Sequence, residues 1–104
     1  MFGLIKDIFS NNDAELVSIV KNGAYLVDVR TPGEFAEGHV AGSVNIPLDQ
    51  IGNRIEEFNG KAQIVVFCRS GNRSGQAKAI LNHHGFNNVV NGGTWQDIKQ
   101  ILNQ

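Results

Sequence analysis

The chain has 104 residues, 41% of them hydrophobic and 18% charged, which is the composition of an ordinary globular protein with one core. Its net charge of −1 provides no basic field for nucleic acid and no polybasic patch for a membrane surface, so we expect neither partner. The single cysteine excludes an intramolecular disulfide and a resolving thiol within the chain, which fits a reducing compartment.

The first twelve residues form an apolar stretch that charged residues interrupt. The stretch lacks the features of a secretory signal, because Lys6 and Asp7 divide it and no small-residue cleavage site follows. It is also too short to span a bilayer, so we expect a cytoplasmic protein without a membrane span. Its apolar residues share one face of a short helix that we expect to pack on the domain: Phe2, Leu4, Ile5, Ile8 and Phe9.

Helical and strand patterns alternate along the rest of the chain. The pattern from Asn12 to Glu15 resembles a capping box and starts a helix that ends at Asn22 and Gly23. Further helices are predicted from Pro32, over 48–58, over 74–84 and over 95–102. Apolar runs predict strands over 25–29, 43–46, 64–67 and 88–90.

This alternation is typical of an α/β fold. We predict a single domain over residues 1–104, with 1–12 as a helical or extended N-terminal extension, and we expect a monomer. The sheet should be central, mostly parallel, of about five strands, and flanked by helices on both faces. Ligands of such sheets bind beyond the carboxyl ends of the strands, and Cys68 falls at one of these ends.

Cys68 directly follows the apolar run 64–67 and opens a polar, glycine-containing segment before a helix. Free N–H groups at a helix start favour anions, and neighbouring arginines favour a thiolate over a thiol. Most free cysteines are small buried hydrophobes, but burial explains a cysteine within the run better than one at its polar exit. The position therefore indicates a reactive thiol.

Four ordered motifs, including Cys-x-x-x-x-Arg after a strand at 68–73, resemble the rhodanese family of sulfurtransferases. Residues 26–30, Leu-Val-Asp-Val-Arg, resemble that family's Asp-Val-Arg strand. Residues 34–47 resemble its Gly-His to Asn-Ile-Pro signature, and residues 85–93 its late strand and Gly-Gly turn. Within the family, residues 74–78 and 92–98 look closest to the small phage-shock-protein E type of single-domain rhodanese.

The resemblance implies that Cys68 takes sulfur from thiosulfate or another persulfide donor and passes it to cyanide or a thiol. Both the thiolate and the persulfide are anions, so the loop must hold a negatively charged sulfur. Backbone N–H groups can do this without a general base, and Gly71 lets the loop close tightly. No cofactor is implied. The active-site loop comprises Arg69, Ser70, Gly71, Asn72, Arg73 and Ser74.

The resemblance also implies different roles for the two loop arginines. Arg69 should point outward and receive the anionic donor, whereas Arg73 should turn inward and pair with an acidic group, either Glu34 or Glu37. Asn72 stands where many thiosulfate-active members carry lysine, and this departure weakens the case for thiosulfate as the physiological donor.

Three further residues are predicted to support the loop. Asp28 ends a buried strand, and a buried carboxylate needs partners, so we assign it a hydrogen-bonded structural role. Arg30 could pair with Glu34 or Glu37, and His39 should pack and hydrogen-bond.

The histidines near the end of the predicted helix 74–84 and the single tryptophan were also considered for a role in a site. His83 and His84 are adjacent on a predicted helix and point apart, and the chain lacks the cysteines of a zinc site, so we predict no metal. Trp95 is interpreted as a core or pocket-rim aromatic.

Three other functions compete with small-molecule sulfur transfer. A phosphatase or arsenate reductase of the same fold would use Cys-x-x-x-x-x-Arg, which is one residue longer than the loop here. A non-catalytic regulatory module would be expected to have lost Cys68. A carrier that exchanges persulfide sulfur with a relay protein needs the same loop as the enzyme. The sequence therefore does not distinguish these two functions.

Overall fold

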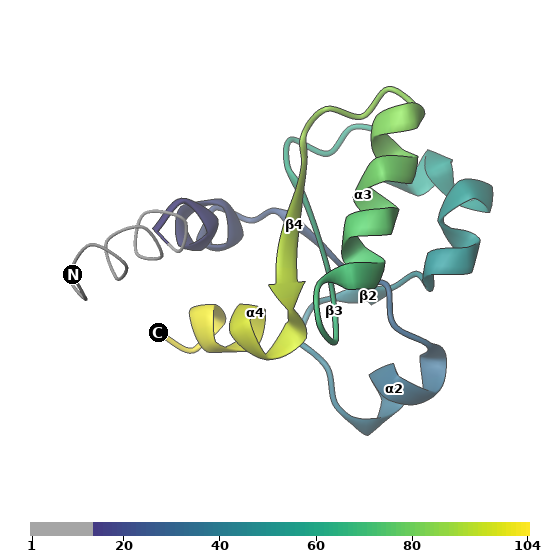
Figure 1. Ribbon diagram of the computed structural model, residues 1–104. Coiled ribbons are helices and arrows are strands. Elements are labelled where there is room, and N and C mark those ends of the chain that lie inside the picture. The colour runs from purple at the N-terminus through teal and green to yellow at the C-terminus, as the bar shows by residue number, and fades with distance from the viewer. Residues whose placement is uncertain (1–13) are drawn as a thin grey trace, which may run out of the picture.

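The computed structural model describes residues 14–104, which form a parallel sheet between two layers of helices (Figure 1). The predicted N-terminal extension and the capping pattern that begins at Asn12 lie outside the described residues. A helix over residues 14–21 comes first. The remaining elements are β1 (Tyr25–Asp28), α2 (Pro32–Glu37), β2 (Val44–Asn45), the 3-10 helices η1 (Leu48–Asn53) and η2 (Ile55–Phe58), β3 (Ile64–Cys68), α3 (Asn72–His83), β4 (Val89–Thr94) and α4 (Trp95–Leu102).

The sheet has the strand order β2-β1-β3-β4, and every neighbouring pair is parallel. Strand β3 lies between β1 and β4, and all five of its residues are buried, as expected for an apolar strand covered on both faces. This central strand carries Cys68 at its carboxyl end. The fold therefore places the thiol at the edge of the sheet where parallel α/β proteins bind ligands.

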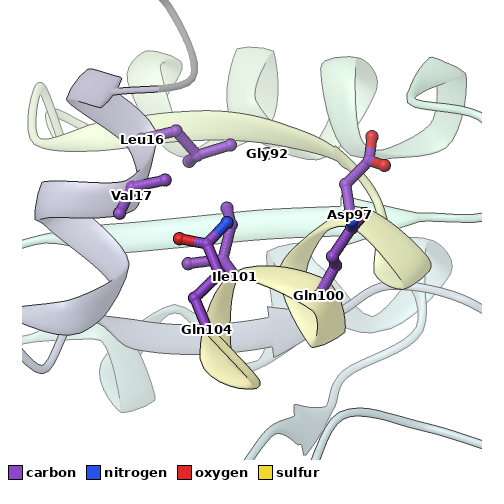
Figure 2. Close-up of a pocket in the computed structure, with 7 residues that line it drawn as sticks. All are labelled: Leu16, Val17, Gly92, Asp97, Gln100, Ile101 and Gln104. Carbon is purple, nitrogen blue, oxygen red and sulfur yellow. The ribbon is translucent and has the colours of Figure 1, made fainter. Parts of the chain in front are cut away.

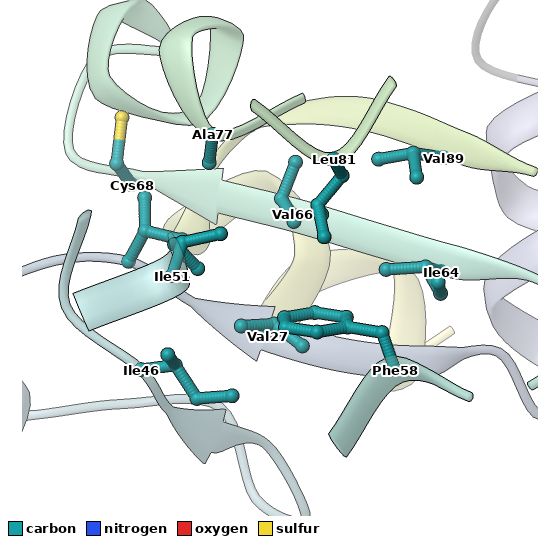
Figure 3. Close-up of a cluster of buried hydrophobic side chains, with 11 residues drawn as sticks. Val27, Ile46, Ile51, Phe58, Ile64, Val66, Cys68, Ala77, Leu81 and Val89 are labelled. Atoms are coloured by element: carbon teal, nitrogen blue, oxygen red, sulfur yellow. The ribbon is translucent and has the colours of Figure 1, made fainter. Parts of the chain in front are cut away.

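Two hydrophobic clusters cover the two faces of the sheet. One lies under α3, η1 and η2 and includes Ile51, Phe58 and Leu81. The other lies under the helix over residues 14–21 and α4 and includes Ile98. Figure 3 shows the first cluster, with the sulfur of Cys68 at the end that is nearest the loop before α3.

The predicted α/β fold with a parallel sheet and helices on both faces is confirmed. Within residues 14–104 the sheet has four strands, not about five. The segment 48–58, predicted as one helix, forms two 3-10 helices, η1 and η2, that meet at Arg54. Its apolar stripe still faces the core, since Ile51 and Phe58 are fully buried.

Strand β4 is longer than predicted and contains a bulge. Val66 pairs with Asn91 but the next residue, Phe67, pairs with Gly93, so Gly92 is the extra residue. A side chain at Gly92 would have no room, because a Cβ there would lie 2.7 Å from Val65 Cγ1 and 2.9 Å from Ile98 Cδ1. The bulge therefore depends on glycine.

Candidate active site

The loop around Cys68 connects β3 directly to α3. Gly71 is the N-cap residue of α3 and has a φ of 94°, in the left-handed region that favours glycine. No side chain caps this helix, so the N–H groups of its first turn remain available to another acceptor. The predicted tight closure of the loop at Gly71 is thus present in the backbone.

The sulfur of Cys68 lies among these donors. The Gly71 N–H donates to Sγ over 3.0 Å, and the hydroxyl oxygen of Ser74 lies 3.5 Å from Sγ. Burial opposes ionisation of the thiol, but the Ser74 hydroxyl and the N–H groups of Ser74, Ser70 and Gly71 outweigh it, so that the pKa of Cys68 lies below its ordinary value. The loop therefore favours a negative charge on this sulfur.

Arg73 forms a two-pronged ion pair with Glu34 of α2. Its Nη1 lies 2.7 Å from Glu34 Oε1 and its Nη2 lies 2.9 Å from Oε2. The hydrogen bonds from Arg73, with smaller contributions from Thr31, lower the pKa of Glu34 from 4.5 to about 2. Of the two predicted acidic partners, Glu34 is the one in the ion pair.

Arg30 was predicted to pair with the side chain of Glu34 or Glu37, but it pairs with neither. It forms an ion pair with Asp28, two residues earlier, with Nη2 2.7 Å from Oδ2. Arg30 also donates to the backbone carbonyls of Glu34 and Gly38. The prediction was wrong because Asp28 is fully buried and needs a cation within reach, and Arg30 is 4% exposed at the same strand end.

The remaining predicted residues lie at the rim of the loop. Arg69, Ser70, Asn72 and Glu37 are exposed, and among the described residues Arg69 forms no ion pair. His39 stacks on Phe35 with the ring centres 3.8 Å apart, and its Nδ1 lies 2.8 Å from the Phe35 carbonyl oxygen. His39 therefore packs and hydrogen-bonds against α2.

A rhodanese-like domain model matches residues 12–97. The chain belongs to the rhodanese-like family. Thiosulfate sulfurtransferase PspE of Escherichia coli K12 is 39% identical over 74 residues, which are 69% of this chain and 71% of the relative. Thiosulfate sulfurtransferase GlpE of Pseudomonas aeruginosa is 37% identical over 82 residues, which are 75% of this chain and 74% of the relative.

A solved structure described as a rhodanese with anions, from E. coli, superposes with a TM-score of 0.65 at 37% identity. The superposition covers 70% of this chain and 88% of that one. Both the sequence and the fold of the segment that carries Cys68 are therefore those of a rhodanese-like domain.

Two side chains that brace the loops of this rhodanese-like domain were not predicted. The amide of Asn45 on β2 donates to the carbonyl oxygens of Asp28 and Arg30. The Arg30 guanidinium also lies 4.5 Å from the ring centre of Trp95 at the start of α4. The asparagine in the motif at 34–47 was a sequence signal for the first contact, whereas nothing local in the sequence indicates the second.

Two cavities border the active-site loop. One of about 540 Å³ is mainly apolar and includes Val29, Leu48 and Ile80, with Arg73 at its edge. The other, of about 350 Å³, is polar and includes Arg69, Glu37 and Trp95. Each cavity is thus lined by one of the two loop arginines.

A third cavity of about 290 Å³ lies on the opposite face of the sheet, between the helix over residues 14–21 and α4 (Figure 2). Among the residues that the structure describes, the lining holds no cysteine, histidine or cation: Leu16, Val17, Gly92, Asp97, Gln100, Ile101 and Gln104. This cavity offers no nucleophile for sulfur chemistry.

The described part of the chain contains no cluster of three or more histidine, cysteine, aspartate or glutamate side chains that could hold a metal ion. Across the same residues, no helix has the length and apolar character needed to cross a bilayer.

Proposed function

We propose that the chain is a sulfurtransferase that moves sulfane sulfur from thiosulfate or another persulfide donor to cyanide or a thiol through a persulfide on Cys68. The observation that carries this proposal is the setting of the thiol: Cys68 is buried at the end of β3, before the loop that leads into α3, and hydrogen bonds from this loop lower its pKa. Membership of the rhodanese-like family and the names of the two thiosulfate sulfurtransferases support it.

The chemistry proceeds in two half-reactions. The Cys68 thiolate attacks the outer sulfur of the donor, a new S–S bond forms, and the bond to the sulfite sulfur breaks with its electron pair on sulfite. The acceptor then attacks the outer sulfur of the persulfide. Thiocyanate leaves when the acceptor is cyanide, and the thiolate is restored. Neither half-reaction needs a general base or a cofactor.

The residues of the loop divide the work. The Gly71 N–H and the first turn of α3 hold the negative sulfur through both half-reactions. The exposed guanidinium of Arg69 receives an anionic donor. The Arg73–Glu34 pair keeps the loop in shape, because both charges are already used within the protein. Cys68 has no exposed surface, so we expect the donor to displace exposed loop groups as it binds.

The charge around the loop favours a donor with little negative charge. Asp28 neutralises Arg30 and Glu34 neutralises Arg73, and Asn72 adds no cation. A dianion such as thiosulfate would be attracted by Arg69 but repelled by Glu37, which lines the same cavity. We therefore propose thiosulfate as a usable donor and a monoanionic persulfide as the preferred one.

A protein persulfide is one such donor, and a carrier role with a relay partner uses the same site. We propose that residues 1–104 act as a single monomeric domain in the cytoplasm, where a lone thiol stays reduced.

Sulfur transfer to cyanide tests the enzyme directly. Wild-type protein should form thiocyanate from thiosulfate, and Cys68→Ser should reduce the rate to that of the buffer, because no second cysteine exists. Retained turnover in Cys68→Ser would contradict the mechanism. The same preparations should not hydrolyse an aryl phosphate, and hydrolysis that depends on Cys68 in a protein that forms no thiocyanate would favour the phosphatase.

A further inference from the structure

Asn91 on β4 makes three hydrogen bonds at the back of the active-site loop. Its Nδ2 donates to the carbonyl oxygen of Gly71 over 3.1 Å. Its Oδ1 accepts from the Ser74 hydroxyl over 2.7 Å and from the Gly93 N–H over 3.0 Å. A carbonyl oxygen only accepts and a backbone N–H only donates, so the Gly71 and Gly93 contacts fix which end of the amide faces which partner.

The fold brings Asn91 to this position in two ways. Side chains alternate along a strand, so Asn91 lies on the same face of β4 as Val89, which packs under α3. Gly75 in the first turn of α3 has no side chain, and a Cβ there would lie 3.4 Å from Asn91 Nδ2. The bulge at Gly92 then turns the Gly93 N–H back toward Asn91 Oδ1.

We infer that Asn91 is a positioning residue for Cys68, because its amide holds together the two groups of the loop that contact the sulfur. The first is Gly71, whose N–H donates to Sγ, and the second is Ser74, whose hydroxyl lies beside Sγ. Asn91 itself makes no hydrogen bond to Cys68 among the described residues, so it acts through these two groups.

The contact with Gly71 restrains the most adaptable residue of the loop. A glycine populates many backbone conformations, and an N–H that is free to turn is a poor donor to a fixed anion. The Gly71 carbonyl also accepts from the Gly75 N–H over 3.1 Å, so Asn91 and α3 hold one peptide group from two sides. The held peptide group follows Gly71, and it limits, through the Gly71 Cα, how far the preceding peptide group can turn the Gly71 N–H away from the sulfur.

The contact with Ser74 has the opposite effect on the charge of the sulfur. A hydroxyl has one hydrogen, so the Ser74 hydroxyl lowers the pKa of Cys68 only when it donates to Sγ, 3.5 Å away, and Asn91 Oδ1, 2.7 Å away, competes for that hydrogen. Loss of Asn91 would release this hydrogen to the thiolate. The Gly71 N–H is 3.0 Å from Sγ whereas the Ser74 oxygen is 3.5 Å away, so we expect the loss of the Gly71 restraint to dominate.

The experiment measures the pKa of Cys68 from the pH dependence of its alkylation by iodoacetamide. Asn91→Ala should raise this pKa by about 0.5 to 1, so that alkylation below both pKa values slows by about threefold to tenfold. Asn88→Ala is the matched control, because Asn88 also donates to backbone carbonyls, those of Lys61 and Ala62, just before β4. It should lower the melting temperature comparably without changing the pKa of Cys68.

The Ser74→Ala background separates the two contacts. In the Ser74→Ala protein no hydroxyl can donate to the thiolate and offset the loss of the Gly71 restraint. Adding Asn91→Ala to it should therefore raise the pKa of Cys68 at least as much as Asn91→Ala does in the wild-type protein. An effect that disappears in this background would overturn the inference, since Asn91 would then act only on Ser74. A pKa that stays unchanged or falls in Asn91→Ala would overturn it as well.

If Asn91→Ala does not fold, Asn91→Asp provides the same test. Aspartate keeps an acceptor for Ser74 and Gly93, lacks the donor for Gly71 and adds a negative charge, so the pKa should rise, and an unchanged or lower value would overturn the inference. We expect the neighbouring charge pairs, Arg73 with Glu34 and Arg30 with Asp28, to persist in all variants, because none of the substitutions replaces their residues.

The inference rests on the proposed role of Cys68 as the nucleophile, but alkylation reports the thiol alone. A wild-type protein that transfers no sulfur would contradict the proposed function and leave the alkylation result to stand on its own. Where sulfur transfer does occur, persulfide formation in Asn91→Ala should slow in proportion to alkylation at the same pH.

Discussion

Two arginines of the active-site loop differ in what their guanidinium groups contact. Arg73 gives both of its terminal nitrogens to Glu34, whose pKa falls to about 2 in consequence. Arg69 is exposed and, within residues 14–104, pairs with no carboxylate. At the scale of single residues, one arginine is therefore used for shape and the other is available to a ligand.

Substitution of each arginine should separate binding from stability. Arg69→Ala should raise KM for an anionic donor by about tenfold and leave the melting temperature unchanged, because a charge-assisted contact to the donor is lost. Arg73→Ala should destabilise the protein by about 1 kcal/mol, the value of a partly exposed pair, and Glu34→Gln should do the same. Equal kinetic losses with unchanged melting temperatures would contradict this division.

At the scale of elements, a glycine with positive φ flanks α3 at each end. Gly71 precedes the helix and Gly85 follows it, with φ values of 94° and 93°. Neither position is crowded: a Cβ on Gly71 would make an ordinary contact of 3.5 Å with Gly93, and one on Gly85 would meet nothing within 4 Å. The two glycines thus differ mainly in their distance from the sulfur.

This pair provides a matched test of the loop. Gly71→Ala and Gly85→Ala should each cost about 1–2 kcal/mol, the penalty of a left-handed conformation for a residue with a Cβ. Gly71→Ala should in addition slow alkylation of Cys68, because the strain disturbs the N–H that contacts the sulfur. Urea denaturation measures the loss of stability in each variant, and the rate of alkylation measures the reactivity of Cys68. Equal alkylation rates in Gly71→Ala and Gly85→Ala would show that the backbone at Gly71 does not support the thiolate.

Most elements could be predicted because their signals are local. The apolar run before Cys68, the proline at the start of α2 and the glycines after helices each dictate structure within a few residues. The segment 48–58 was misjudged because an apolar stripe fits a 3-10 helix as well as an α-helix. The bulge at Gly92 lies against Val65 of β3, which is distant in sequence, so no local pattern reveals it.

In the candidate site, too, residues with a local sequence signal could be predicted and residues placed by tertiary packing could not. Cys68, Gly71 and Arg73 belong to one short motif that the sequence displays. The partner of Arg30 was mispredicted because the choice among Asp28, Glu34 and Glu37 depends on which carboxylate is buried. Asn91 was overlooked as a site residue, although its alternation with Val89 places it on the α3 face of the sheet.

At the scale of the whole molecule, the buried pair of Asp28 and Arg30 joins the parts that surround the loop. Arg30 contacts the carbonyls of α2 and the loop after it, and stacks on Trp95 of α4. The side-chain amide of Asn45 on β2 donates to the backbone carbonyls of Asp28 and Arg30. The side chains of Arg30 and Asp28 are 5% and 0% exposed, so neither charge can be solvated if the other is lost.

Loss of this arginine should therefore destabilise the fold strongly. Arg30→Ala leaves the Asp28 carboxylate buried without a cation and should cost about 3–5 kcal/mol in urea denaturation. Arg54→Ala is the control, because its pair with Glu57 is exposed and should contribute at most about 1 kcal/mol. Similar losses from both substitutions would show that the buried pair is not what joins these elements.

The persulfide itself provides the most direct test of the mechanism. Intact-mass spectrometry of the wild-type protein after exposure to thiosulfate should show the addition of one sulfur atom, which a thiol acceptor or cyanide then removes. Cys68→Ser should show no addition under the same conditions. An unmodified wild-type mass after exposure to thiosulfate and to a persulfide donor, or an equal addition to Cys68→Ser, would contradict the proposal that Cys68 carries the transferred sulfur.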